Sequence, residues 1–462
     1  MPLHRIACVM LLPLALILAM ESVAAAADQP QDDRPNIVVI ISDDSGFNEF
    51  SLNGSKNFKT PRIDSIAEGG VKFTEGYTSG TVCSPTRAGL LTGRYQNRFG
   101  HEFNIPPVYS DSNGLPLSET TIADLMKGAG YRTIALGKWH LGYAPKFHPL
   151  SRGFTDYHGF LQGARSYFPL ETPTILNRLL RDREPIPETF EYMTDELGRA
   201  AAEYLSEPHD RPFFMYLAFN ATHGPNHATA ADIKEVGDGP GNRTLRAMTH
   251  AMDRAVGVVL DELDRQGLTD NTLIFFLNDN GGVRGHDNTP LSGFKGSTWE
   301  GGIRVPFAIR WPAKIKPSQR FDAPVISLDI LPTALAAAKI TKAPQKTLDG
   351  VNLLPWLTTG RTDRPHQTLY WKNGTKWAVR DGDLKYVVCS APNAPKARQK
   401  KANAAARTIP VQSGLFHIPT DPGEKTDLSG QHPDKVQRLT QMYEAWKKDF
   451  PPTPWAPASA RQ

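Results

Sequence analysis

Ile37-Val38-Val39-Ile40-Ile41-Ser42-Asp43-Asp44 is an uninterrupted apolar run that ends in polar and acidic residues. A short run rich in β-branched side chains indicates a strand that is buried on both faces of a parallel sheet. Three later segments also pass directly from apolar to polar residues: 133–136 before Gly137-Lys138-Trp139-His140, 213–219 before Asn220-Ala221-Thr222-His223, and 273–277 before Asn278-Asp279-Asn280.

Helical periodicity separates these predicted strands. Apolar residues recur at helical spacing in four segments: 63–68, 121–126, 192–205 and 245–263. Alternating strands and helices predict an α/β fold, with a large doubly wound, mixed and mostly parallel sheet flanked by helices. Ligands of such sheets bind beyond the carboxyl ends of the strands, where the polar residues of this chain would collect.

The residues expected at that edge favour a hard cation. Asp43, Asp44, Asp279 and Asn280 supply three carboxylates and one amide. Oxygen donors of this kind suit Ca²⁺ best and Mg²⁺ second, and the chain has no Cys/His spacing typical of zinc sites. Adjacent carboxylates repel unless a cation lies between them, so we expect one bound calcium ion, with magnesium less favoured.

The pattern changes after Pro306. Residues 329–335 predict a last core helix, and a connection rich in Pro and Gly follows it. Beyond it lie three short strand-like segments, 377–380, 384–388 and 415–418, and an amphipathic helix from Asp434 with Val436, Leu439, Tyr443 and Trp446 inward. They predict a smaller C-terminal antiparallel sheet with one packed helix. The expected organisation is a signal peptide (1–27), a catalytic domain (28–360) and a C-terminal subdomain (361–462).

Residues 1–27 have the features of a secretory signal peptide. His4 and Arg5 precede an apolar run over residues 6–20, and small residues follow before Asp28. The run is too short for a membrane span, so we expect an exported, periplasmic or secreted protein without stable membrane insertion. Cys8 lies in this segment and Cys83 belongs to a motif described below, which leaves Cys389 without a partner. No structural disulfide is therefore expected.

The charge balance bears on the partner. The 52 Lys and Arg residues against 48 Asp and Glu give a net charge of +4, which suits an anionic substrate but is too weak to indicate nucleic-acid binding. The basic segment at residues 396–407 predicts a solvated loop at least as well as a polyanion contact.

Cys83-Ser84-Pro85-Thr86-Arg87, continued by Ala88-Gly89-Leu90-Leu91-Thr92-Gly93-Arg94, is the most specific motif of the chain. Pro85 predicts a helix that opens there, with Cys83 just outside its amino end. A thiol at the positive end of a helix dipole, beside a guanidinium, is expected to be acidic and exposed to reagents. The motif resembles the signature of the type I sulfatases, in which a separate maturation enzyme oxidises this Cys to formylglycine (3-oxoalanine), the catalytic nucleophile.

The resemblance covers most of the chain. Other motifs similar to those of the family are Pro35-Asn36-Ile37, Thr60-Pro61-Arg62-Ile63-Asp64, Gly137-Lys138-Trp139-His140-Leu141-Gly142, Thr222-His223-Gly224-Pro225, Asp279-Asn280-Gly281-Gly282 and Gly293-Phe294-Lys295-Gly296. The resemblance implies an alkaline phosphatase-like fold and a calcium ion held by Asp43, Asp44, Asp279, Asn280 and the modified Cys83. It also implies that Arg87 holds the formylglycine and that Lys138, His140, His223 and Lys295 surround the sulfate.

These implied roles agree with the chemistry of the side chains. Calcium and Arg87 would lower the pKa of the attacking formylglycine hydroxyl, and Lys138 and Lys295 would stabilise charge on the sulfuryl oxygens. His223 could protonate the leaving sugar oxygen, and His140 could accept the proton of the second hydroxyl as sulfate is expelled.

The substrate is predicted less sharply. Residues 153–168 resemble glycan-directed members similar to arylsulfatases and N-acetylgalactosamine-6-sulfatases, some of which act on galactose or N-acetylgalactosamine sulfates. Tyr143, His158, Arg165 and Tyr167 are candidate sugar contacts, and ordinary surface positions are an equally favoured interpretation. Departures from the common family pattern at Asn278, at Asn226-His227 and after Asp44 fall where the sugar would lie.

The sequence therefore predicts an exported, calcium-dependent sulfatase acting on a sulfated carbohydrate, with a formylglycine-generating enzyme as its maturation partner. Two alternatives remain open. One is a phosphonate monoester or phosphodiester hydrolase that uses the same formylglycine. The other is a non-catalytic sulfated-glycan binding protein in which Cys83 is never oxidised.

Overall fold

The computed structural model describes residues 33–341, 344–390 and 411–457. The predicted signal peptide and the basic segment at residues 396–407 lie outside these ranges. Within them, Cys83 and Cys389 are buried and free. No helix in the described part of the chain has the length and apolar character needed to cross a bilayer.

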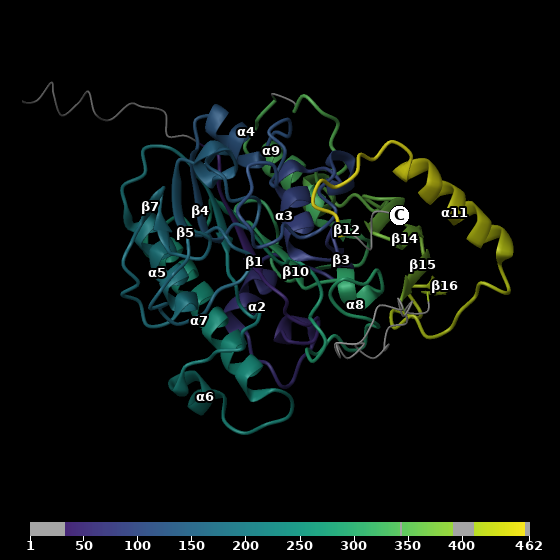
Figure 1. Cartoon of the computed structure of the whole chain (residues 1–462), viewed down its shortest axis with the longest axis horizontal. Coiled ribbons are helices and arrows are strands. Elements are labelled where there is room, and N and C mark those ends of the chain that lie inside the picture. Colours follow the sequence, from purple (N-terminus) through teal and green to yellow (C-terminus); the bar gives the residue numbers. More distant parts are fainter. Residues whose placement is uncertain (1–32, 342–343, 391–410, 458–462) are drawn as a thin grey trace, which may run out of the picture. The chain divides into compact units, whose positions relative to one another are not determined.

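A ten-stranded mixed sheet organises the chain from Pro35 onward (Figure 1). Its strands are β1 (Asn36–Ser42), β2 (Val71–Phe73), β4 (Arg132–Lys138), β5 (Asp156–Phe160), β6 (Leu180–Arg181), β7 (Glu184–Pro185), β8 (Phe213–Ala218), β9 (Thr272–Asn278), β10 (Phe307–Arg310) and β11 (Gln319–Phe321). Their order is β11-β2-β10-β9-β1-β8-β4-β5-β6-β7, and the strands from β9 to β5 run parallel. The predicted mixed, mostly parallel sheet is confirmed, and it contains all four predicted strands. A separate pair joins β3 (Gly76–Tyr77) and β12 (Val325–Ile326).

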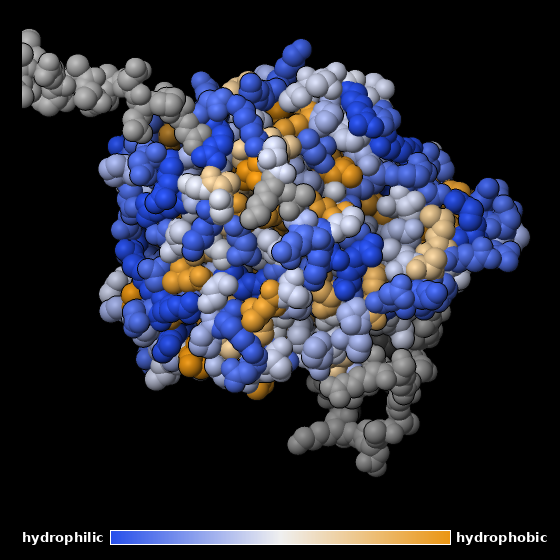
Figure 2. Space-filling view, turned by 90° about the horizontal axis from the view of Figure 1, so that it is seen from above, coloured by the Kyte–Doolittle hydropathy of each residue, from blue (hydrophilic) through white to orange (hydrophobic). Residues whose placement is uncertain are grey.

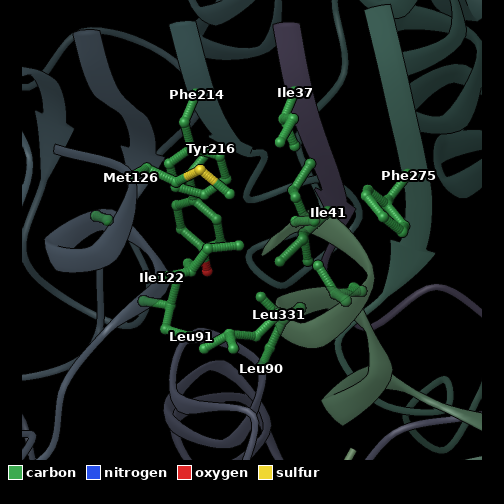
Figure 3. Close-up of a cluster of buried hydrophobic side chains, with 14 of the residues drawn as sticks. Ile37, Ile41, Leu90, Leu91, Ile122, Met126, Phe214, Tyr216, Phe275 and Leu331 are labelled. Carbon is green, nitrogen blue, oxygen red and sulfur yellow. The ribbon is translucent and has the colours of Figure 1, made fainter. Parts of the chain in front are cut away.

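Helices cover both faces of this sheet. The helices that precede the C-terminal sheet are α2 (Pro61–Glu68), α3 (Cys83–Thr92), α4 (Ile122–Gly128), α5 (Met193–Ser206), α6 (Ala230–Val236), α7 (Arg243–Arg265), α8 (Glu300–Ile303), α9 (Ile330–Ala337) and α10 (Leu354–Thr358). Successive side chains of β1 point to opposite faces. Ile37 and Ile41 pack with residues of α3, α4 and α9 (Figure 3), whereas Val38 and Ile40 join a second cluster with α2, α5 and α7. The double burial explains why residues 37–41 of β1 are all apolar.

The C-terminal part contains the predicted small antiparallel sheet. Its strands are β13 (Thr368–Asn373), β14 (Lys376–Asp381), β15 (Leu384–Ser390) and β16 (Val411–His417), joined in sequence order. Helix α11 (Pro433–Lys447) packs on this sheet, and the Tyr443 ring stacks on Trp377 with centroids 4.1 Å apart. The sequence-based prediction misses β13, although Leu369 and Trp371 alternate inward as expected for a half-buried strand.

The surface drawn in Figure 2 is mostly hydrophilic, with apolar side chains in small separate groups. Scattered apolar residues of this kind are normal on a folded protein, so this face gives no sign of a large apolar docking surface. The proposed domain limits at residues 28–360 and 361–462 stay a prediction.

Candidate active site

Two polar pairs, with three carboxylates and one amide between them, meet at the carboxyl edge of the large sheet. Asp43-Asp44 directly follows β1 and Asp279-Asn280 directly follows β9, and the two parallel strands pair in register up to Ser42 opposite Asn278. The Ser42 hydroxyl donates to Asn278 Oδ1 over 2.9 Å, and Asn278 Nδ2 donates to the Ser45 carbonyl over 2.7 Å. Asn278 thus ties the two strand ends together, which gives this departure from the common pattern a structural role.

Cys83 lies against these acids as the first residue of α3, after Val82 at the N-cap. The prediction that the helix opens at Pro85, with Cys83 outside it, is therefore wrong by two residues. Cys83 is 0% exposed, and its Sγ lies 3.5 Å from Asp43 Oδ1. The predicted exposure to reagents is also wrong, because segments distant in the sequence cover the thiol.

Arg87 follows one helical turn after Cys83 and is equally buried. Its Nε and Nη2 donate to Asp279 Oδ2 over 3.0 and 2.9 Å, and its Nη1 donates to the Lys138 carbonyl over 3.0 Å. The guanidinium therefore connects α3 to the ends of β9 and β4. A planar donor set that bridges several partners in this way fixes their relative positions.

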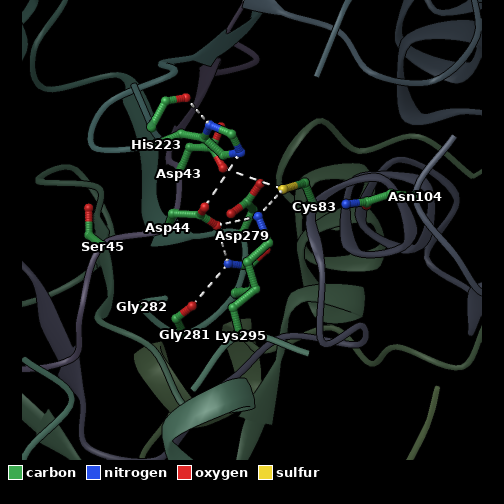
Figure 4. A network of polar contacts seen from close by, with 12 residues as sticks. Asp43, Asp44, Ser45, Cys83, Asn104, His223, Asp279, Gly281, Gly282 and Lys295 are labelled. Atoms are coloured by element: carbon green, nitrogen blue, oxygen red, sulfur yellow. Dashed lines mark hydrogen bonds and ion pairs between the residues drawn. The ribbon is translucent and has the colours of Figure 1, made fainter. Parts of the chain in front are cut away.

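Three more cationic or ionisable side chains surround the acids, and Figure 4 shows two of them, His223 and Lys295. Lys138, at the end of β4, donates to Asp43 Oδ2. Lys295 Nζ lies 2.6 Å from Asp44 Oδ1 and 3.0 Å from Cys83 Sγ. His223 Nε2 lies 3.5 Å from Asp44 Oδ2, and its Nδ1 lies 2.6 Å from the Gly224 carbonyl. A carbonyl only accepts, so Nδ1 carries a proton and Nε2 is the atom that exchanges protons.

The donor atoms of this cluster fit a divalent cation. One ligand atom from each of Asp43, Asp44, Cys83 and His223 lies within 4.8 Å of the others. Asp279 Oδ1 and Asn280 Oδ1 are buried and lack a hydrogen-bond partner among the described residues. Buried oxygens without partners are costly unless another group compensates them, and a hard cation supplies that compensation. His223 is a geometric member of this cluster, although the sequence predicts it as a proton donor and not as a ligand.

Two residues of the site have left-handed backbone conformations that non-glycine residues rarely adopt. The φ angle is 63° at Asp44 and 57° at His140. Close packing accompanies the second, because a Cβ added to Gly163 would lie 2.4 Å from His140 Cε1. Strained conformations of this kind concentrate at functional sites, where the surrounding fold holds them.

Comparison with known proteins agrees with this geometry. The Sulfatase family model matches residues 35–340. The chain belongs to the sulfatase family. It is 31% identical to N-acetylgalactosamine-6-sulfatase of Mus musculus over 96% of this sulfatase and 92% of the relative, and 33% identical to arylsulfatase A of Homo sapiens over 93% and 90%. The crystal structure of Ps i-CgsB in complex with k-i-k-neocarrahexaose has a TM-score of 0.81 and 33% identity, covering 91% of this chain and 94% of its own. This sulfatase is accordingly a sulfuric ester hydrolase with an alkaline phosphatase-like fold.

The pKa of the Cys83 thiol in the sulfatase site differs from the sequence-based prediction. Burial, followed by the negative charge of Asp279, raises the pKa of Cys83 to about 12, so the unmodified thiol is not acidic as predicted. Burial alone would raise the pKa of Asp43, but Lys138, His223, Arg87 and Lys295 outweigh it and lower this pKa. Burial and then Lys138 lower the pKa of His140, which keeps its imidazole neutral.

The C-terminal sheet of the sulfatase supports the site through the turn between β13 and β14. Asn373 Nδ2 donates to Thr81 Oγ1 over 2.7 Å, two residues before Cys83. Lys376 Nζ donates over 2.7 Å to the carbonyl of Gly296, the residue after Lys295. No sequence pattern identifies these supporting residues, because their role depends on a contact between distant parts of the chain.

The four candidate sugar contacts have structural roles in this sulfatase. Tyr167 is 0% exposed, and its hydroxyl lies 2.5 Å from the Asn220 carbonyl and 2.9 Å from the His223 carbonyl. His158 Nε2 lies 3.0 Å from Glu196 Oε1, Arg165 donates to Glu188 over 2.6 Å, and Tyr143 is buried. Their burial contradicts the interpretation as ordinary surface positions, direct sugar contact stays a prediction, and Tyr167 also positions the backbone around His223.

Proposed function

We propose that this sulfatase is an exported, calcium-dependent enzyme that hydrolyses a sulfate ester on a carbohydrate of the galactose or N-acetylgalactosamine type. The nucleophile would be formylglycine made from Cys83 by a separate maturation enzyme. The observation that carries the proposal is the cluster of Asp43, Asp44, Cys83 and His223, together with two buried oxygens, Asp279 Oδ1 and Asn280 Oδ1, that have no hydrogen-bond partner among the described residues. The sugar class is supported by the N-acetylgalactosamine-6-sulfatase relatives and by the carbohydrate bound to Ps i-CgsB.

Asp43, Asp44, Asp279 and Asn280, with the modified Cys83, would hold the cation. When bound, calcium would polarise the sulfate and the nucleophile, and formylglycine would supply a hydroxyl that attacks sulfur. Lys138 and Lys295 are positioned to stabilise negative charge on the sulfuryl oxygens. Arg87 holds the start of α3 in place through Asp279 and the Lys138 carbonyl.

Two histidines would move protons. His223 Nε2 would donate a proton to the leaving sugar oxygen, because its Nδ1 is already committed to the Gly224 carbonyl. His140 Nε2 lies 3.4 Å from the Ile105 carbonyl, and its Nδ1 is buried without a partner among the described residues. Nδ1 is therefore the atom that would accept a proton as sulfate is released.

A substrate panel tests the reaction and the sugar together. The protein is co-expressed with a formylglycine-generating enzyme, and sulfate release is measured from sulfated monosaccharides and polysaccharides. We expect release from a galactose-type sulfate ester. Intact sulfate esters together with cleavage of a phosphonate or phosphodiester would contradict the proposal and favour the alternative hydrolase.

Removal of the divalent cation is expected to stop sulfate release and to lower the midpoint of thermal unfolding. Asp43, Asp44 and Asp279 are buried together and would lose their compensating charge. A ligand present at 100 times its Kd adds about 2.7 kcal/mol to the stability of the native state. Unfolding is followed by scanning calorimetry after chelation and again after addition of Ca²⁺ or Mg²⁺.

The matched control for chelation is Asp279→Asn, which keeps the shape of the side chain but removes one charge. The chelator should lower the unfolding midpoint of this variant much less than that of the wild-type protein. Full activity in a sample shown by elemental analysis to be metal-free would overturn the calcium requirement.

A further inference from the structure

Residues 101–105 form an irregular segment that holds the start of α3. Asn104 Oδ1 accepts from the backbone N–H of Ser84, the residue after Cys83, over 2.9 Å. This N–H lies in the first turn of the helix, where no partner within the helix is available to it. The Ser84 hydroxyl lies 2.6 Å from Nε2 of His101, whose side chain is 0% exposed. Two side chains of the segment therefore fix the peptide next to the proposed nucleophile.

The same segment contacts His140 at its other end. The Ile105 carbonyl lies 3.4 Å from His140 Nε2. Ile105 is 2% exposed and His140 is 5% exposed, so little water can compete for this carbonyl. A carbonyl only accepts, so the contact favours the tautomer that carries its proton on Nε2 and leaves Nδ1 open to accept one.

The C-terminal tail, residues 451–457, packs against this segment. The indole Nε1 of Trp455 donates to the Phe103 carbonyl over 2.9 Å. The rings of Trp455 and His101 meet edge to face, with centroids 4.8 Å apart and an interplanar angle of 82°. An indole in this position both fixes the backbone of the segment and covers the imidazole that contacts Ser84.

A second set of contacts holds the segment at Glu102. Its backbone N–H donates to Thr453 Oγ1 of the tail over 3.2 Å. Its carboxylate lies 2.6 Å from Lys372 Nζ of β13 and accepts from the Gly374 backbone N–H. The segment has no strand or helix of its own, so the tail and the C-terminal sheet supply the contacts that fix it.

We infer that Trp455 is a positioning residue of the active site, which acts through residues 101–105 on Ser84 and His140. The inference rests on the roles proposed for Cys83 and His140, and it assigns part of their placement to the end of the chain. Trp455 is not among the residues that line the cavity of about 500 Å³ beside the acidic cluster, in the part of the chain that the structure describes. It would act on the rate of the chemical steps and not on substrate binding.

The test measures kcat and KM for sulfate release by Trp455→Ala, with kcat expressed per formylglycine found by mass spectrometry. This normalisation separates the effect from any change in maturation. We expect kcat to fall by about 10- to 100-fold, because small displacements of reacting groups have effects of this size. KM should change by less than about 2-fold, because uniform binding of the substrate is untouched. Trp455→Phe keeps a ring against His101 but lacks the N–H donor, and it should recover part of the lost kcat.

Two further variants separate positioning from stability. Thr453→Val removes the hydroxyl that accepts from the Glu102 N–H, and it should lower kcat by about 5-fold, the effect of one neutral hydrogen bond. The matched control is Trp356→Ala in α10. Trp356 is 8% exposed, and its indole Nε1 donates to the Asp363 carbonyl over 2.6 Å. Its loss should lower the unfolding midpoint, as the loss of Trp455 does, without changing kcat.

The inference is overturned by an unchanged kcat in Trp455→Ala, or by an equal fall of kcat in Trp356→Ala, because either result reduces Trp455 to a stabilising residue. If Trp455→Ala does not fold, Thr453→Val decides by the same two constants, and an unchanged kcat in that variant overturns the inference. Failure of the proposed function is recognised separately: the wild-type enzyme would then release no sulfate or contain no formylglycine.

Discussion

Cys83→Ala is expected to lower the rate of sulfate release by about 10⁴-fold or more, because alanine lacks the thiol that would have to be oxidised to give the proposed formylglycine nucleophile. The fold should persist, since alanine is smaller than cysteine and the charged neighbours stay paired without the thiol, Lys295 with Asp44 and Lys138 with Asp43. Initial rates on the preferred sulfate ester measure the loss, and circular dichroism verifies the fold.

The control for Cys83 is Cys389→Ala, which removes the other described thiol, buried in β15. This variant should release sulfate at the wild-type rate. Mass spectrometry of the Cys83 peptide gives a second measurement, because maturation replaces the sulfur by oxygen and removes two hydrogens. Wild-type rates in Cys83→Ala, or an active enzyme whose Cys83 peptide is wholly unmodified, would refute the formylglycine mechanism.

Arg87→Ala is expected to lower the free energy of unfolding by about 3–5 kcal/mol, the usual result of removing one partner from a buried ion pair. Both partners are 0% exposed, and Arg87 supplies two hydrogen bonds to Asp279 and one to the Lys138 carbonyl. Without the guanidinium the Asp279 carboxylate is buried beside Asp43 with less compensation. Activity should fall as well, because α3 loses its connection to the sheet edge. Denaturant unfolding in the presence of the metal measures the change.

Arg98→Ala is the matched comparison for Arg87. Arg98 also forms a short ion pair, 2.7 Å from Asp349, but its side chain is 37% exposed. Solvent screening limits such pairs to about 1 kcal/mol or less. If both variants lose a similar amount of free energy of unfolding, burial of the Arg87 ion pair does not increase its contribution to stability.

Much of the fold could be predicted because parallel strands buried on both faces have uniformly apolar sequences. The place of the proposed metal site could also be predicted. Parallel neighbouring strands end on the same side of a sheet, and Asp43 and Asp279 directly follow β1 and β9. The order of the strands is harder to predict from the sequence. On one side of β9, the short strand β10 pairs antiparallel with β9, and the short strand β2 pairs antiparallel with β10. Such segments bury few residues and have no distinctive periodicity.

The environment of Cys83 could not be predicted for a related reason. Local rules place a thiol near a positive helix end and predict an acidic, exposed group. Burial raises the pKa of the thiol more than the helix end lowers it. The residues around the thiol are distant in the sequence, since Lys295 comes 212 residues later and Asp43 comes 40 residues earlier. Tyr167 shows the same limit: its type suits a sugar platform, but its buried hydroxyl contacts the Asn220 and His223 carbonyls.

The enclosure of Cys83 also sets an order of events during synthesis of the chain. Asn373, which contacts Thr81 beside the start of α3, is made 292 residues after it. Until the segments that carry Lys295 and Asn373 leave the ribosome and fold, the cover over the sulfur of Cys83 is incomplete. The proposed maturation enzyme would therefore have to reach this sulfur before folding is complete.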